Sequence, residues 1–322
     1  MDKPLVLDVD DLEDIGALEE YIQRSQVILF FLSRGYFKSR NCLREVRSSL
    51  EMDKPLVLVQ EADPAKGGGT LTALRAECPE ELQPDIFDQD WPLTIWYRIN
   101  DFQLVSLKII AEALLLCSPA YLNKTSLPLC VSGELESQSL AFSKQTTLWA
   151  SPANAGAQDL ADEIAAAFAG LTISTTDARP ANATHMLLYL NEDSFVSDER
   201  LAEQVKQARE DRLKVVMAHE NDPALGGCEF AKFFETTPQE LINAGLYDAL
   251  AIACFPGLHH EVSLVLLAKA LGATPVSARS SIRDSLSNIG RFTTVPRGST
   301  TSDPVVTEED SQLEQVPEVE QV

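Results

Sequence analysis

The sequence lacks the features that mark a disulfide-bonded, metal-binding or membrane-spanning protein. Its six cysteines form no CxxC pair and lie near no cluster of histidines, so neither disulfide bridges nor a metal site is expected. The start of the chain has neither a basic segment nor an apolar core, so we expect no signal peptide. The most apolar helical stretches, near residues 109–117 and 262–271, are short and contain Glu112 and Lys269, so no membrane span is expected. Together these absences favour a reducing, cytoplasmic setting.

Basic residues are also scarce. Lys and Arg number 26 against 49 Asp and Glu, for a net charge of −23, and this charge would repel nucleic acids and anionic membranes. Part of it is local, because residues 303–322 hold seven acidic residues and no basic one. The 45% of hydrophobic residues is typical of a folded protein, and 322 residues are enough for two domains with separate cores.

The chain repeats itself once over a long period. Several short segments recur in the same order, with an offset of 157 to 159 residues. The recurring pairs include Glu61–Gly68 with Glu220–Gly227, Cys78–Leu82 with Thr237–Leu241, and Val105–Leu107 with Val262–Leu264. Because a solenoid repeat is several times shorter, this period indicates two diverged copies of one domain.

In both copies, short apolar runs that are typical of strands alternate with segments whose apolar residues recur at helical spacing. In the first copy, strands are predicted near residues 5–9, 27–32, 55–59 and 94–97, with helices at 16–24, after Ser39 and at 102–116. In the second copy, strands are predicted at 147–150, 171–174, 186–190 and 213–218, with helices at 159–168, 198–209 and 261–271. This alternation predicts an α/β fold, a doubly wound parallel sheet in each copy. The predicted domains are residues 1–117 and 146–272, with a connector at 118–145 and a disordered acidic tail at 273–322.

A motif follows the apolar run at residues 27–32. Ser33, Tyr36, Ser39, Cys42 and Glu45 form the pattern Ser-x-x-Tyr-x-x-Ser-x-x-Cys-x-x-Glu. This segment resembles the Toll/interleukin-1 receptor (TIR) domain, over about residues 3–117 and more weakly over 146–272. The resemblance implies tandem flavodoxin-like folds, each with five strands in the order 2-1-3-4-5 and a site at the strand carboxyl ends.

Each copy departs from a complete TIR domain in its own way. The first copy lacks the first strand and helix, so either the sequence is a fragment or another segment takes that central place. The second copy has only about ten residues between Ser174 and His185, which predicts that its self-association loop and second helix have shrunk or vanished. Neither copy therefore has the whole catalytic constellation of the family.

The resemblance implies two functions. The first is an intracellular signalling or assembly module that acts through protein–protein interaction, with other TIR-like domains or further copies of the chain as partners.

The alternative is an NAD⁺ hydrolase, with NAD⁺ as substrate and no other cofactor, in which Glu45 is catalytic and stabilises oxocarbenium character at the ribose. Cys42 would assist as a thiol at a helix N-terminus. Ser33, Tyr36, Ser39 and the second-copy residue Glu203 are the remaining ligand-pocket candidates. The incomplete copies favour assembly.

Two other patterns invite a functional interpretation. The acid–glycine loops Glu61–Gly69 and Glu220–Cys228 lack the Lys-Ser/Thr of a phosphate-binding loop and carry repelling acids, so tight turns are predicted. His219, His259 and His260 have no partnered Asp or Cys at metal-ligand spacing and are predicted to be core or surface histidines.

Overall fold

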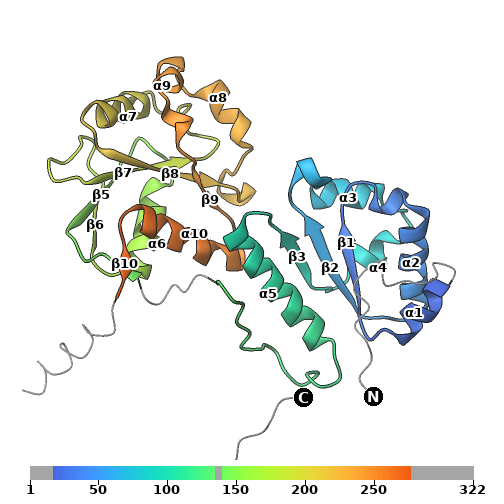
Figure 1. Ribbon diagram of the computed structural model, residues 1–322. Coiled ribbons are helices and arrows are strands. Elements are labelled where there is room, and N and C mark those ends of the chain that lie inside the picture. Colours follow the sequence, from blue (N-terminus) through green and yellow to red (C-terminus); the bar gives the residue numbers. More distant parts are fainter. Residues whose placement is uncertain (1–16, 135–139, 277–322) are drawn as a thin grey trace, which may run out of the picture. The chain divides into compact units, whose positions relative to one another are not determined.

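The computed structural model describes residues 17–134 and 140–276 and places them in two parallel α/β sheets (Figure 1). The α/β class predicted from the alternating pattern is confirmed. The predicted strand at residues 5–9 lies outside the described residues, and so does the predicted disordered tail from residue 277 onward.

The first sheet has three parallel strands in the order β1-β2-β3. The strands are β1 (Ile28–Leu32), β2 (Leu56–Glu61) and β3 (Leu93–Trp96). Four helices cover one face, namely α1 (Leu18–Arg24), α2 (Arg40–Glu51), α3 (Leu71–Glu77) and α4 (Gln83–Phe87), and α5 (Asn100–Leu116) packs on β2 and β3 from the other face. Apolar strand residues such as Phe30 and Leu58 are buried against Val46, Leu74 and Ile86 of the covering helices.

The second sheet has five parallel strands in the order β6-β5-β7-β8-β9. This is the 2-1-3-4-5 order of a flavodoxin-like fold. The strands are β5 (Thr146–Ala150), β6 (Leu171–Ser174), β7 (His185–Leu190), β8 (Lys214–Glu220) and β9 (Ile252–Cys254). Residues 175–184 contain no helix, as the short spacing predicted.

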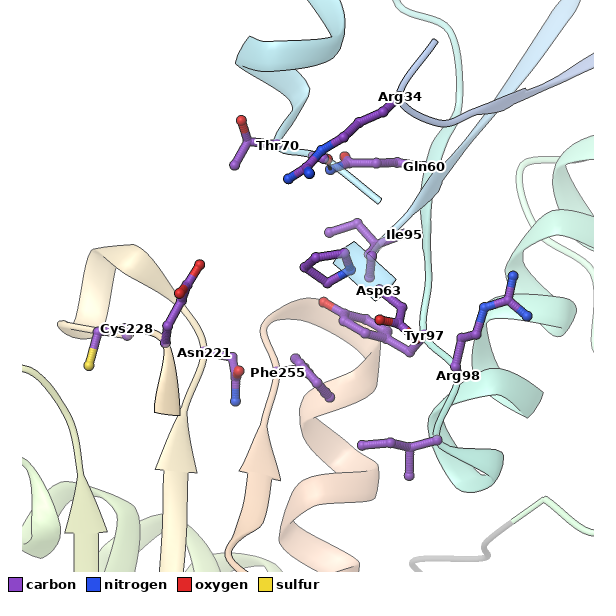
Figure 2. A pocket seen from close by; sticks show the side chains of 16 residues that line it. Arg34, Gln60, Asp63, Thr70, Ile95, Tyr97, Arg98, Asn221, Cys228 and Phe255 are labelled. Atoms are coloured by element: carbon purple, nitrogen blue, oxygen red, sulfur yellow. Dashed lines mark hydrogen bonds between the residues drawn. The ribbon is translucent and has the colours of Figure 1, made fainter. Parts of the chain in front are cut away.

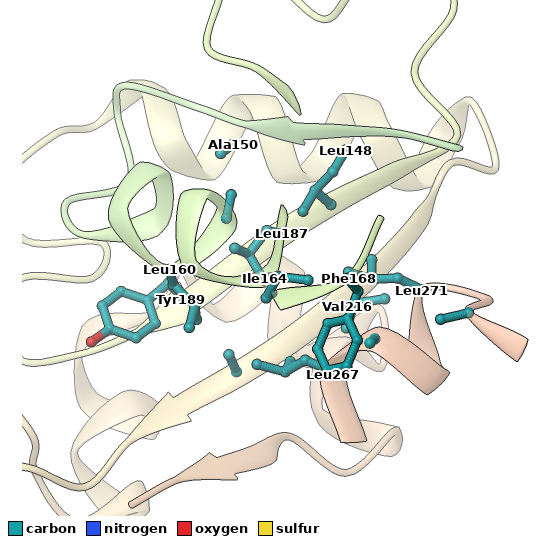
Figure 3. Packing of buried hydrophobic residues seen from close by; sticks show 14 of the residues in the cluster. Leu148, Ala150, Leu160, Ile164, Phe168, Leu187, Tyr189, Val216, Leu267 and Leu271 are labelled. Carbon is teal, nitrogen blue, oxygen red and sulfur yellow. The ribbon is translucent and has the colours of Figure 1, made fainter. Parts of the chain in front are cut away.

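Helices cover both faces of the second sheet. On one side lie α6 (Ala157–Ala167) and α10 (His260–Ala270), and on the other α7 (Arg200–Glu210), α8 (Phe233–Thr236) and α9 (Gln239–Asn243). Figure 3 shows Ile164 of α6 and Leu267 of α10 meeting Leu187 and Val216 of the sheet. These strands are buried on both faces, which explains why β7 reads as an unbroken apolar run.

A short strand pair lies beyond two of the predicted boundaries. A short antiparallel pair joins β4 (Leu140–Ala141), inside the predicted connector, to β10 (Thr274–Pro275), inside the predicted tail. Ordered structure therefore extends beyond both ends of the segment 146–272. Two-residue strands are too short to produce a periodic pattern, so neither could be predicted from the sequence.

Candidate functional site

The motif residues lie on one continuous segment after β1. The chain turns at Gly35, whose φ of 85° is in the left-handed region that glycine tolerates, and continues into a 3-10 turn, Tyr36–Lys38. Ser39 then caps α2, since its hydroxyl accepts the backbone N–H of Cys42 at 3.4 Å. This path brings Tyr36 back to α2, where its hydroxyl donates to a carboxylate oxygen of Glu45 at 3.3 Å.

Burial changes the acidity of both members of this pair. It raises the pKa of the half-buried Glu45 above its ordinary value, and the hydrogen bond from Tyr36 opposes that rise. The pKa of Tyr36 is raised well above its ordinary value, first by burial and then by the negative charge of Glu45. A partly desolvated carboxylate interacts more strongly with a nearby positive charge than a fully hydrated one does. Glu45 therefore has the electrostatic character that a cation-stabilising group needs.

The other predicted site residues do not join this pair. Within the described part of the chain, no hydrogen bond links Ser33 or Cys42 to Glu45. Cys42 does lie close enough to Tyr36 to contribute, after burial and Glu45, to the raised pKa of that tyrosine. Glu203 is exposed on α7. At the position that corresponds to Cys42, Arg200 forms ion pairs with acidic residues. The two halves of the chain therefore present different residues at these corresponding positions.

A cavity of about 670 Å³ lies where strand carboxyl ends from both sheets meet (Figure 2). Loops after β1, β2 and β3 line it from the first half, and loops after β8 and β9 line it from the second. Its size is in the range of small-molecule sites, and strand carboxyl ends are where ligands bind to parallel sheets. Neither Tyr36 nor Glu45 lines it. The sequence motif and the cavity are thus separate features.

The cavity combines an apolar wall with the positive charge of Arg34. Tyr97 and Phe255 stack with ring centroids 3.9 Å apart and come from different halves. Arg34 is exposed, and its positive charge lies near enough to Glu77 to contribute to the lowered pKa of that carboxyl, after the N–H of Gly35 and the ammonium of Lys38. Asp63 and Glu229 add negative charge to the rim. The cavity can therefore hold a small apolar or aromatic group, with Arg34 as an anchor for an anionic substituent.

Buried glutamates organise the two acid–glycine loops. A carboxylate oxygen of Glu61, which is fully buried, accepts the backbone N–H of Asp63 at 3.0 Å. Glu220 accepts the N–H groups of Asn221 at 2.9 Å and Asp222 at 2.6 Å. The side chains of Asp63 and Asp222 each cap a short 3-10 turn that follows. The loops are tight turns, as predicted, and an internal carboxylate occupies donors that a phosphate would need.

The two glutamates have different side-chain partners. Arg98 donates to Glu61 through Nη2 at 2.6 Å and Nε at 3.1 Å. Glu220 instead accepts the hydroxyl of Tyr189 at 2.5 Å, and burial, followed by this carboxylate, raises the pKa of Tyr189. Sequence reasoning missed both roles. The signal that could have indicated them is the recurrence of an acid at the end of an apolar strand in both halves of the chain.

A buried histidine joins the two halves. The Nε2 of His259 lies 3.0 Å from the hydroxyl of Ser106 on α5, which also donates to the carbonyl of Ile95 at 2.7 Å. The His259 ring packs edge-on against Tyr97. Burial lowers the pKa of His259 from 6.5 to about 4. The histidine is therefore neutral at pH 7 and belongs to the core, in line with the sequence prediction.

We expect the free energy of unfolding to fall by about 2 kcal/mol between pH 7 and pH 5 through His259 alone. The unfolded chain binds a proton on this residue below pH 6.5, whereas the folded chain does so only near pH 4. Acidification therefore favours the unfolded state across that window. Denaturant unfolding at both pH values measures the effect.

His259→Gln is the control for this prediction, because it removes the titrating group. Burial also lowers the pKa of His185 and His219, so some pH dependence should survive in the variant. An unchanged difference between pH 7 and pH 5 in His259→Gln would contradict the assignment.

Within residues 17–134 and 140–276, no helix is long and apolar enough to cross a membrane. In the same ranges, no group of three or more His, Cys, Asp and Glu residues could hold a metal ion. No protein-family model, curated protein or solved structure matches the chain. The resemblance to TIR domains therefore rests on the sequence motif, and the fold is compatible with it.

Proposed function

We propose that the chain is a TIR-type assembly module, built from two diverged copies of one domain and acting through protein–protein interaction. Its partners are other TIR-like domains, including further copies of the chain. The observation that carries the proposal is the open edge of β1. Among the described residues, β1 pairs with β2 alone. In the second half, the strand at the equivalent position is β7, and it pairs with both β5 and β8.

Matching local structures support the duplication. The loops after β2 and β8 have the same geometry, with an aspartate cap, a proline at the start of a 3-10 turn and a glycine in the left-handed region. The carbonyls of Gly67 and Gly226 accept the N–H groups of Arg34 and Glu192 at 2.7 Å and 2.8 Å. Such detail is what a shared origin would leave after most side chains had changed.

The open edge has the chemistry of an association site. The N–H of Ile28 donates to Pro55 beside β2, and alternate residues of a strand point their backbone groups in opposite directions. The N–H and C=O of Leu29 and Phe31 therefore face away from β2. Phe30 and Leu32, their neighbours, are fully buried. An apolar strand with unpaired backbone groups on one side is a template for another strand.

We expect Phe31→Pro to abolish self-association of the chain. Proline removes one outward-facing N–H without breaking a hydrogen bond to β2, and proline is tolerated at strand edges. Light scattering over a range of concentrations should show oligomers of the wild-type chain and a monomer of the variant.

Phe31→Ala is the matched control, since it removes the same ring but keeps the N–H. The alanine variant should still associate. If both variants give the same mass as the wild type, β1 is not the association edge and the proposal loses its main support.

The contact between Tyr36 and Glu45 favours NAD⁺ hydrolysis as a second candidate function. A carboxylate whose pKa is raised by burial is a feature of functional sites. Cleavage of the nicotinamide–ribose bond would use Glu45 to stabilise positive charge on the ribose. Incubation of the purified chain with NAD⁺, followed by detection of free nicotinamide, tests this function directly.

A further inference from the structure

The cavity at the strand carboxyl ends is built from the same loops of both halves. Its lining includes three pairs of residues that are separated by the offset of the recurring sequence segments. The pairs are Gly69 with Cys228, Thr70 with Glu229, and Tyr97 with Phe255. The first two pairs lie in the loops after β2 and β8, and the third lies just after β3 and β9. Corresponding loops of the two halves therefore line the cavity together.

A buried apolar cluster fixes one wall of this cavity. The rings of Tyr97 and Phe255 stack with centroids 3.9 Å apart, and the ring of Phe102 lies edge-on to Phe255 at 4.8 Å. Phe102 and Val105 of the first half are buried in this cluster with Val262 of the second. A wall that belongs to the core is formed before a ligand arrives, so binding requires little further ordering of side chains.

The charges around the cavity differ between the halves. Arg34 comes from the first half, and its side chain lies against Gly69, where an added Cβ would be 3.3 Å from Cγ of the arginine and 3.4 Å from its Nε. Arg98 also lines the cavity, but its guanidinium is held by Glu61. Among the described lining residues, the second half contributes Glu229 and no basic side chain. Arg34 is therefore the group that can anchor an anion.

The hydroxyl of Tyr97 is a second polar group at the cavity (Figure 2). Tyr97 is only 8% exposed, and its hydroxyl makes no hydrogen bond with any residue in the ranges 17–134 and 140–276. Burial, followed by the charge of Asp222, raises the pKa of Tyr97 to about 12, so the hydroxyl stays protonated at pH 7. A hydroxyl so far removed from bulk water favours a hydrogen-bonding partner, which a polar group of a ligand can supply.

We propose that this cavity binds a planar aromatic carboxylate that carries a hydroxyl group on its ring. Arg34 pairs with the carboxylate, Tyr97 donates to the ring hydroxyl, and the ring packs on the apolar wall that includes Ile95 and Phe255. The inference is independent of the proposed assembly function, because no residue of β1 lines the cavity.

The chemistry of the lining selects this ligand class. A purely apolar molecule would leave both Arg34 and the Tyr97 hydroxyl without a partner. A second anionic group would meet the negative charges of Asp63 and Glu229 at the rim. A phosphate would need backbone donors that the internal carboxylates of Glu61 and Glu220 already occupy. One negative charge and one neutral hydroxyl on an aromatic ring satisfy all of these conditions.

The test is titration calorimetry of the full chain with 6-hydroxy-2-naphthoate. We expect saturable binding with one site per chain. Three analogues each change one feature of the probe. The amide, 6-hydroxy-2-naphthamide, lacks the charge and should bind roughly tenfold more weakly. The compound 2-naphthoate lacks the hydroxyl and should bind roughly fivefold more weakly. Naphthalene-2,6-dicarboxylate adds a second charge and should also bind more weakly than the probe.

Two variants assign these losses to their protein groups. Arg34→Gln should weaken binding of the probe roughly tenfold but barely change binding of the amide. Tyr97→Phe keeps the ring, as Phe255 does at the corresponding position, and should weaken binding of the probe roughly fivefold but barely change binding of 2-naphthoate. Arg40→Gln is the matched control, since Arg40 is also an exposed arginine of the first half but does not line the cavity. It should bind the probe like the wild type.

Three outcomes would overturn the inference. One is that the probe shows no saturable binding to the wild-type chain. Another is that Arg34→Gln and the wild type bind the probe equally well, which would place the anion elsewhere. The third is that the dicarboxylate binds more tightly than the probe, which would exclude the proposed ligand class. None of these outcomes bears on self-association, which Phe31→Pro tests separately.

Discussion

Replacement of Arg98 by methionine is expected to lower the free energy of unfolding by about 3 kcal/mol. The carboxylate of Glu61 is fully buried, and Arg98 neutralises it with hydrogen bonds of 2.6 Å and 3.1 Å. Methionine keeps the length of the side chain but leaves an uncompensated charge in the core. Because the Arg98 side chain is 43% exposed, water can partly replace it, and the loss should lie at the lower end for a broken buried pair.

Two controls separate this effect from simple loss of a surface charge. Arg75 pairs with Asp88, and both side chains are largely exposed, so Arg75→Met should cost much less than Arg98→Met. The double variant Glu61→Leu with Arg98→Met removes both charges and should recover much of the stability. Chemical denaturation measures all three. Equal losses for Arg98→Met and Arg75→Met would show that Glu61 is not dependent on its partner.

Glu45→Gln is expected to lower NAD⁺ cleavage by on the order of 10²-fold or more, if the chain has that activity. Glutamine keeps the size and the hydrogen bond with Tyr36 but removes the charge that would stabilise an oxocarbenium ion. Nicotinamide release under saturating NAD⁺ measures the loss. The free energy of unfolding should change by less than about 1 kcal/mol, because burial already disfavours the charged form of Glu45.

Glu203→Gln is the matched control for Glu45→Gln. Glu203 is exposed on α7, and the segment before it lacks the tyrosine contact, so its replacement should leave any cleavage unchanged. Cleavage that survives Glu45→Gln intact would rule out Glu45 as the catalytic carboxylate. Such a result would leave the assembly proposal untouched.

The sequence predicted the elements whose patterns are long. The apolar runs of β1, β2, β7 and β8 and the spacing of α5 are strong enough to be read locally. The strand β9 was missed because three residues, Ile252–Cys254, give no period to detect. The helices α3, α4, α8 and α9 have at most seven residues, so their patterns are equally weak.

The candidate site was predictable only where its residues are neighbours in sequence. Tyr36 and Glu45 are nine residues apart, and the motif placed them on one segment. Arg98 lies 37 residues from Glu61, and Ser106 lies 153 residues from His259. Such pairings depend on how the strands are ordered and how the halves pack, and a single sequence contains no local signal for either.

The apolar cluster that joins the halves has a consequence during synthesis. Tyr97, Phe102 and Val105 of the first half are buried with Val262 of the second, and the contact from Ser106 to His259 spans 153 residues. At typical elongation rates, this stretch takes roughly 8–30 s to translate. During that interval the first half has emerged with this cluster uncovered beside the open edge of β1. The nascent chain therefore has a window in which aggregation competes with completion, and chaperone capture would be most useful then.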